Sequence, residues 1–182
     1  MKSFGPDSRP MMISAPGDKN MQPWRLRDAD RTLRLFITAF LALVTAGYAV
    51  GLSYVGHTTS NTVHGLSEQF RGTPESSSVS ELKYAKSADE MSILLHNHVL
   101  SLSLVFFCVG GVFYFSSLVN PGIKRFLMIE PIAAIATTFG GIWLVRFVSS
   151  SFSWLVLVSG VSMAGCLAVM ALLILWALWM KR

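Results

Sequence analysis

The stretch LFITAFLALVTAGYAVGLSYVG, residues 35–56, carries no charged side chain and decides the class of this protein. A helix of that length is long enough to cross a bilayer, which takes about 20 residues. Three further apolar segments of similar length follow at about 97–119, 126–148 and 153–179. The sequence therefore predicts an integral membrane protein with four spans.

The composition agrees with this prediction. The chain has 182 residues, of which 52% are hydrophobic and only 14% charged, and its mean hydropathy is +0.52. The connections between the last three spans are short, which makes those helices antiparallel neighbours. We therefore expect an all-α, four-helix up-down bundle over residues 35–182, preceded by a short cytoplasmic tail over 1–34 and carrying an external loop over 57–95.

The basic residues predict the orientation. The net charge of +5 comes from clusters that four spans place on one side of the membrane, at Arg25–Arg34, Lys124–Arg125 and Lys181–Arg182. The loop 57–95 carries three basic residues against five acids. The positive-inside rule then puts both termini in the cytoplasm and the loop outside, in a bacterial inner membrane. Topology explains the basic excess without a nucleic acid partner.

Local motifs subdivide the tail and the loop. Residues 1–23 are rich in Pro, Gly and Ser, and we expect no fold from them alone. Residues 24–34 form either a short interfacial helix or a charged stop before the first span. In the loop, Val63, Leu66 and Phe70 have helical spacing and favour a helix on the membrane surface. Ser87 and Glu90 form a capping box that starts the second long helix near Ala88.

The four histidines of the chain, His57, His64, His96 and His98, are predicted to share one layer near the external surface. His96 and His98 are about 200° apart on a regular helix, so only one of them can face the bundle. A facing pair, His57 with either His96 or His98, has the residue type and helix placement of axial ligands for a b-type haem. Histidines at a membrane interface are equally consistent with no site at all.

Other residues extend this hypothesis. Arg146 is expected in the same layer, where it would pair with haem propionates or a quinone headgroup, or else with lipid phosphates. Copper or zinc bound by His57, His64 and one of His96 and His98 is a smaller possibility. Gly47, Gly51 and Gly56 would let a flat macrocycle approach the first helix, or else serve plain helix packing. Gly160, Ala164 and Ala168 repeat the spacing of close helix contacts.

Other function classes find little support. Glu130 is expected to pair with Lys124 and Arg125, and no acidic or histidine partner is predicted deeper in the bilayer, which argues against a proton-coupled transporter. No nucleophile–base pair, phosphate-binding loop or dinucleotide motif is present. Hydrolase chemistry thus has no candidate residues.

The segments GLSYVGH (51–57) and LLHNHVLS (94–101) give the chain a general resemblance to small four-helix membrane anchors of b-type cytochrome character. The resemblance implies a multi-pass subunit of a larger membrane electron-transfer complex, with haem b or a quinone near the histidines and other membrane subunits as partners. The alternative is a structural accessory subunit that packs against a membrane complex and stabilises it.

Overall fold

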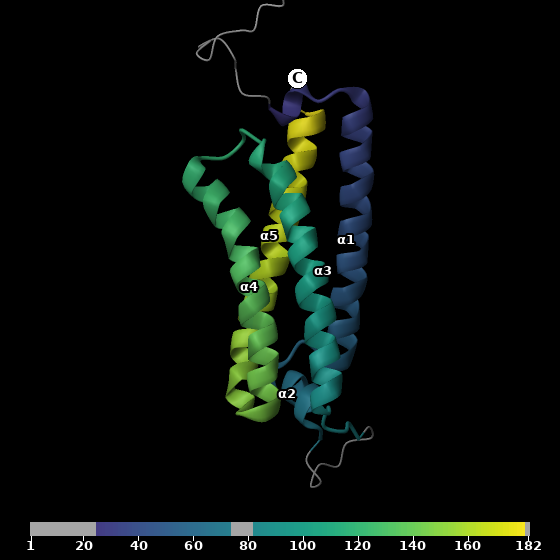
Figure 1. Ribbon diagram of the computed structural model, residues 1–182, viewed down its shortest axis with the longest axis vertical. Coiled ribbons are helices and arrows are strands. Elements are labelled where there is room, and N and C mark those ends of the chain that lie inside the picture. The colour runs from purple at the N-terminus through teal and green to yellow at the C-terminus, as the bar shows by residue number, and fades with distance from the viewer. Residues whose placement is uncertain (1–24, 74–81, 181–182) are drawn as a thin grey trace, which may run out of the picture.

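The computed structural model of the protein describes residues 25–73 and 82–180, so the predicted tail 1–23 lies outside the described residues. The described part is helical and contains no strand. Its elements are η1 (Leu26–Asp28), α1 (Arg31–Thr59), α2 (Val63–Arg71), α3 (Ala88–Tyr114), α4 (Pro121–Phe147), η2 (Ser150–Phe152) and α5 (Ser153–Trp179). The long helices α1, α3, α4 and α5 run up and down side by side (Figure 1), which confirms the predicted four-helix membrane bundle.

Side-chain caps fix where these helices begin. Ser87 accepts a hydrogen bond from the Glu90 backbone, and Glu90 accepts one from the Ser87 backbone, so α3 begins where its capping box predicts. Asn120 caps α4 ahead of Pro121, whose missing N–H has no helical partner to lose at a first turn. Asp30 caps α1 by accepting from the Leu33 amide at 3.2 Å.

The core is centred on α4 and α5. These two helices pack most extensively on each other, and α3 packs against both. Gly141 permits the close approach, because a Cβ there would stand 2.8 Å from a methyl group of Val156. At the same level the Thr138 and Ser159 hydroxyl groups join the helices through a buried hydrogen bond of 2.7 Å.

Helix α1 is the peripheral member of the bundle. It packs on α5 and α2 and has no extensive contact with α3 or α4 among the described residues. In its most apolar stretch 11% of the residues are buried, against 44% in α4 and in the segment that contains α5. Its buried long side chains, Ile37 and Leu41, lie in the first three turns.

Each end of the bundle has its own character. The basic end carries η1, the α3–α4 connection and the end of α5, whereas the loop end carries α2 and the connection into α3 (Figure 1). At the basic end η1 is a single turn whose Leu26 is 1% exposed and whose amide donates to the Phe115 carbonyl at 3.1 Å. Leu26 therefore inserts between the helix ends. In the segment where we considered an interfacial helix, the described residues 25–34 form this single turn and the start of α1.

Helix α2 closes the loop end. Its Leu66 and Phe70 are buried, and α2 packs against α1, α4 and α5. Gly65 is required at the turn, since a Cβ there would fall 2.0 Å from the Thr59 carbonyl oxygen. The predicted helix is present, but its apolar face covers the end of the bundle instead of facing the membrane surface.

Candidate functional site

The four histidines all lie toward the loop end, in the last turn of α1 (His57), in α2 (His64) and in the first half of α3 (His96 and His98). Each of them is exposed. Within residues 25–73 and 82–180, no three His, Cys, Asp or Glu side chains come close enough to hold a metal ion. Copper or zinc binding by these histidines therefore stays a prediction, and the described residues do not form a three-ligand cluster for it.

His98 is the member of the α3 pair that faces a neighbouring helix. Its ring lies 5.4 Å from the Phe139 ring of α4, and its Nδ1 lies 2.9 Å from the Leu94 carbonyl oxygen, one turn earlier. The angular separation of about 200° puts His96 on the opposite flank of α3, away from α4. His96 is thus the better placed of the two to meet a group outside the α3–α4–α5 core.

His57 and His64 have other surroundings. Counting about 100° per residue, His57 lies on the side of α1 opposite Ile37, Leu41 and Tyr48, the side chains that face the bundle. His64 Nδ1 lies 3.5 Å from a carboxylate oxygen of Glu68, one turn later on α2. Neither ring is directed at the core in this arrangement.

Arg146 fastens the loop end. Its Nε donates to the Lys86 carbonyl at 2.5 Å, and its guanidinium lies 5.0 Å from the centre of the Phe147 ring. Two further cations act in the same way, because Arg71 donates to the Val145 carbonyl at 2.9 Å and Lys83 to the Thr58 carbonyl at 2.5 Å. These bonds join α1, α2, α4 and the segment before α3. The sequence predicts that Arg146 lies near the external surface, but it does not predict which carbonyl group accepts its hydrogen bond.

Glu130 differs from its predicted role. The expected partner Lys124 instead donates to the carbonyls of Tyr114 and Ser116. One carboxyl oxygen of Glu130 is buried without a hydrogen-bond partner among the described residues. The carboxyl group lies near the Cys166 thiol of α5 and near Tyr48 of α1. The sequence predicted that the Glu130 carboxyl group would lie at the membrane surface beside Lys124 and Arg125, whereas one of its oxygens is buried in the bundle.

Comparison with known proteins gives one match. The sequence fits the family model Aq_1264_TM, described as a transmembrane helical domain, over residues 60–182. The chain belongs to this family. No curated protein and no solved structure matches it.

The Aq_1264_TM segment coincides with a structural division. It starts at residue 60, directly after the last residue of α1, and includes α2, α3, α4 and α5. The peripheral helix α1 lies outside the matched segment. Four apolar helices of spanning length together with the family match make this chain a multi-pass membrane protein.

Proposed function

We propose that this Aq_1264_TM protein is an accessory subunit of a larger membrane complex, which it stabilises by packing α1 and α3 against another subunit. The observation that carries the proposal is an uncovered inner face on α1. Gly51, Leu52 and Val55 lie on or beside the helix face that buries Ile37 and Leu41, yet all three are exposed. A bundle that closed on its own would bury this face.

Glu130 supports the same proposal. Its buried, unpartnered oxygen lies in the bundle on the side where Tyr48 approaches from α1. Removing a polar group from water without a hydrogen bond costs free energy, and hydrocarbon supplies no partner. Because this oxygen is buried within the chain, a polar side chain from a neighbouring subunit would reach it only if α1 moved aside.

Site-specific photocross-linking in native membranes tests the proposal. A photoreactive amino acid replaces Leu52 or Val55, and the matched control carries it at Val50, which is 70% exposed and lies about 160° around the helix from Leu52. We expect cross-links from positions 52 and 55 to one distinct protein that co-purifies at fixed stoichiometry, and none from position 50. Lipid adducts alone at all three positions, or links only between copies of this chain, would contradict the proposal.

A second candidate is an electron-transfer subunit that binds haem b or borders a quinone site. It is supported by His96, exposed on the flank of α3 away from α4, and by the open space around Gly47 and Gly51. A haem held by two histidines needs both rings to converge on one iron. The orientation of His57 on α1 is unfavourable for this, so α1 would have to rotate about its axis when haem binds.

A reduced-minus-oxidised absorption spectrum with metal analysis on the purified native protein tests this candidate. A low-spin haem band that is lost both in His57→Ala and in a His96→Ala/His98→Ala double variant would support co-ligation. Copper or zinc without haem, lost also in His64→Ala, would support the metal alternative. If the purified protein contains neither haem nor metal, the accessory role is the candidate that stands.

A further inference from the structure

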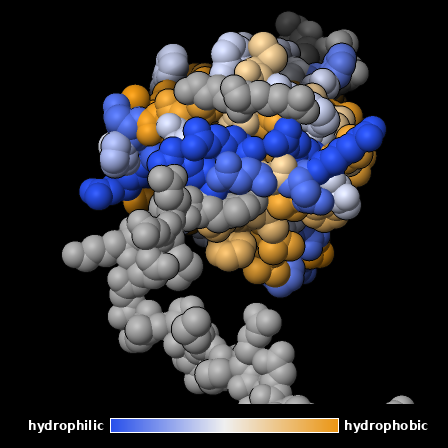
Figure 2. All heavy atoms as spheres, turned by 90° about the horizontal axis from the view of Figure 1, so that it is seen from above, coloured by the Kyte–Doolittle hydropathy of each residue, from blue (hydrophilic) through white to orange (hydrophobic). Residues whose placement is uncertain are grey.

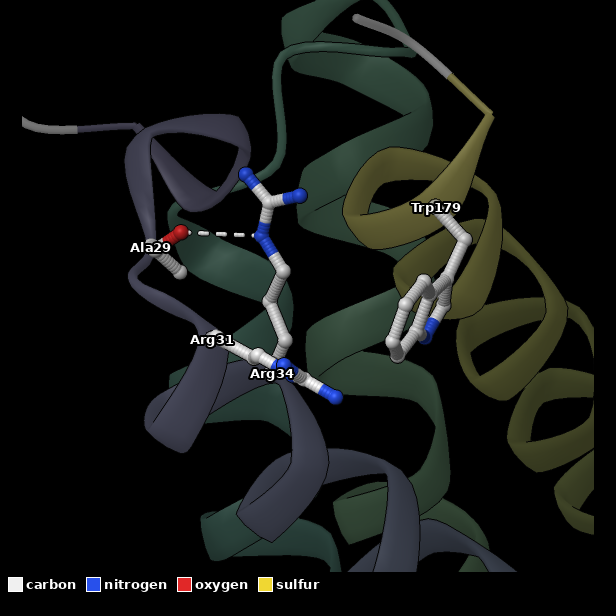
Figure 3. Close-up of a pocket in the computed structure, with 4 residues that line it drawn as sticks. All are labelled: Ala29, Arg31, Arg34 and Trp179. Atoms are coloured by element: carbon white, nitrogen blue, oxygen red, sulfur yellow. Dashed lines mark hydrogen bonds between the residues drawn. The ribbon is translucent and has the colours of Figure 1, made fainter.

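We propose a second site: a pocket at the basic end that binds the phosphate of an anionic phospholipid headgroup. The pocket has a volume of about 310 Å³ and is lined by Ala29, Arg31 and Arg34 from the start of α1 and by Trp179 from the end of α5. Figure 3 shows the two arginine side chains on one side and the indole facing them across the opening. This site is independent of the proposed accessory role.

The pocket holds positive charge without a matching acid. Arg31 and Arg34 are neighbours on the surface of α1, and neither makes an ion pair with a described acidic residue. The two nearby carboxylates are engaged elsewhere: Asp28 with Arg27 and the Arg25 amide, and Asp30 as the cap of α1. Adjacent like charges repel, so an anion between the two guanidinium groups would be stabilising.

Arg34 is oriented for such an anion. Its Nε donates to the Ala29 carbonyl at 2.8 Å and one terminal nitrogen donates to the Arg27 carbonyl at 2.9 Å. A guanidinium has five N–H donors, so donors remain for an oxyanion after both of these bonds form. The side chain is therefore held in place before a ligand arrives, and the planar fork matches two phosphate oxygens.

The opposite wall indicates a lipid as the source of the phosphate. Trp179 donates from Nε1 to the Thr38 hydroxyl oxygen at 3.0 Å, which ties the end of α5 to α1. Leu172 and Trp176 precede it at helical spacing and are 67% and 51% exposed. This apolar stripe continues from the pocket along α5, where the acyl chains of a bound lipid would lie. Basic pockets between membrane helices are recognised sites for acidic headgroups.

The charge of this end agrees with that reading. Viewed from the basic end, a hydrophilic band crosses the molecule between hydrophobic surfaces (Figure 2). A tryptophan at such a boundary is typical of the headgroup level of a membrane. The phosphate would lie within this band and the acyl chains outside it.

Native mass spectrometry of the full chain in a zwitterionic detergent tests the proposal, with dioleoyl phosphatidylglycerol and dioleoyl phosphatidylcholine as probes. Both lipids carry a phosphate that the Arg34 fork can bind, but the choline cation of phosphatidylcholine would be repelled by the second arginine. We therefore expect phosphatidylglycerol, whose headgroup carries a net negative charge, to bind about tenfold more tightly. Arg31→Gln should remove this preference; since Arg31 makes no described contact that holds the fold, the variant should stay folded. Arg125→Gln, the same change at an exposed residue of α4, should keep the preference.

Three results would overturn the proposal. Equal binding of the two lipids would mean that the pocket does not select an anionic headgroup. An equal loss in Arg31→Gln and Arg125→Gln would mean diffuse surface charge instead of a pocket. Glycerol 3-phosphate tests the lipid source: if it displaces phosphatidylglycerol at equal concentration, the site takes a soluble phosphate.

Arg34→Lys, which keeps the charge but loses the fork, should bind with intermediate affinity.

Discussion

Gly141 lies where α4 and α5 come closest, and a Cβ there would meet Val156 at 2.8 Å. We expect Gly141→Val to destabilise the protein by about 1–3 kcal/mol, because a larger side chain has to separate two packed helices. Gly140→Val is the matched control, since a Cβ at Gly140 meets no atom within 4 Å. Thermal unfolding followed by size-exclusion chromatography compares the two variants; equal losses would contradict the assignment of this contact.

Glycine spacing in the sequence predicted other contacts. Gly47, Gly51 and Gly160 each have open space where a Cβ would stand, so none of them provides the expected close approach within this chain. Spacing finds small residues on one helix face, but a membrane helix is apolar all round and its pattern does not say which face meets a neighbour. Gly141 was visible in the sequence as half of a Gly-Gly pair, and only the packing distinguishes it from Gly140.

Glu130 leads to a prediction about stability. Its buried oxygen has no described partner, so Glu130→Met, which keeps the length and removes the polar group, should raise the free energy of unfolding of the isolated protein by about 1–3 kcal/mol. Ile129→Met, at an exposed neighbouring position, serves as the control. The measurement is unfolding in mixed detergent. A large loss of stability in Glu130→Met would mean that the carboxyl group already has its partner within the chain.

At the scale of elements, the first residues of helices could be predicted from the sequence because the capping motifs that set them are local. The Ser87–Glu90 capping box predicted the first residue of α3, and the residue-63 to residue-70 pattern predicted α2. The sequence did not predict that α2 packs against the end of the bundle. An apolar stripe on a short helix fits a membrane surface and the open end of a bundle equally well, and only the packing against α4 and α5 decides.

The hydrogen bond from Arg146 to the Lys86 carbonyl joins α4 to the segment that leads into α3. Arg146→Met should free that segment, since a hydrogen bond from a charged donor contributes about 1.5–3 kcal/mol. We expect faster tryptic cleavage after Lys83 and Lys86, followed by mass spectrometry of the fragments. Arg125→Met makes the same change at the basic end and should leave these rates unaltered. An unchanged rate in Arg146→Met would show that the segment is held by other contacts.

For the molecule as a whole, the number of helices and their alternating direction followed from the length of the apolar segments. The candidate site did not follow in the same way. The histidines do share one end of the bundle, but the rotation of each helix about its axis decides which of them converge, and that rotation is set by packing. It directs His98 toward Phe139 and leaves His57 on the outer side of α1.

The division between α1 and the rest also appears only at this scale. The family match begins at residue 60, after the last turn of α1, and α1 is the long helix with the smallest buried share. The matched segment thus contains α4 and α5, the two helices with the largest buried share. The proposed accessory role therefore predicts that a second subunit attaches at the uncovered inner face of α1.

The distribution of charge between the two ends predicts the orientation of the molecule in the membrane. The basic end presents the cations of Arg25, Arg27, Arg31, Arg34, Lys124 and Arg125 beside two aspartates. The loop end carries the cations of Arg71, Lys83, Lys86 and Arg146 beside the carboxylates of Glu68, Asp89 and Glu90. Positive charge close to membrane spans is retained on the cytoplasmic side, so the loop end should face outward.

Cysteine labelling in spheroplasts measures this orientation. In a background of Cys108→Ala and Cys166→Ala, Tyr84→Cys marks the loop end and Ser117→Cys marks the basic end; both positions are exposed. A membrane-impermeant maleimide should label position 84 in intact spheroplasts and position 117 only after permeabilisation, because the charge distribution predicts a cytoplasmic basic end. The reverse pattern would place the Arg31–Arg34 pocket in the outer leaflet and the histidines on the cytoplasmic side. Equal labelling of both positions before permeabilisation would mean that the chain inserts in both orientations and that its charge asymmetry is too weak to select one.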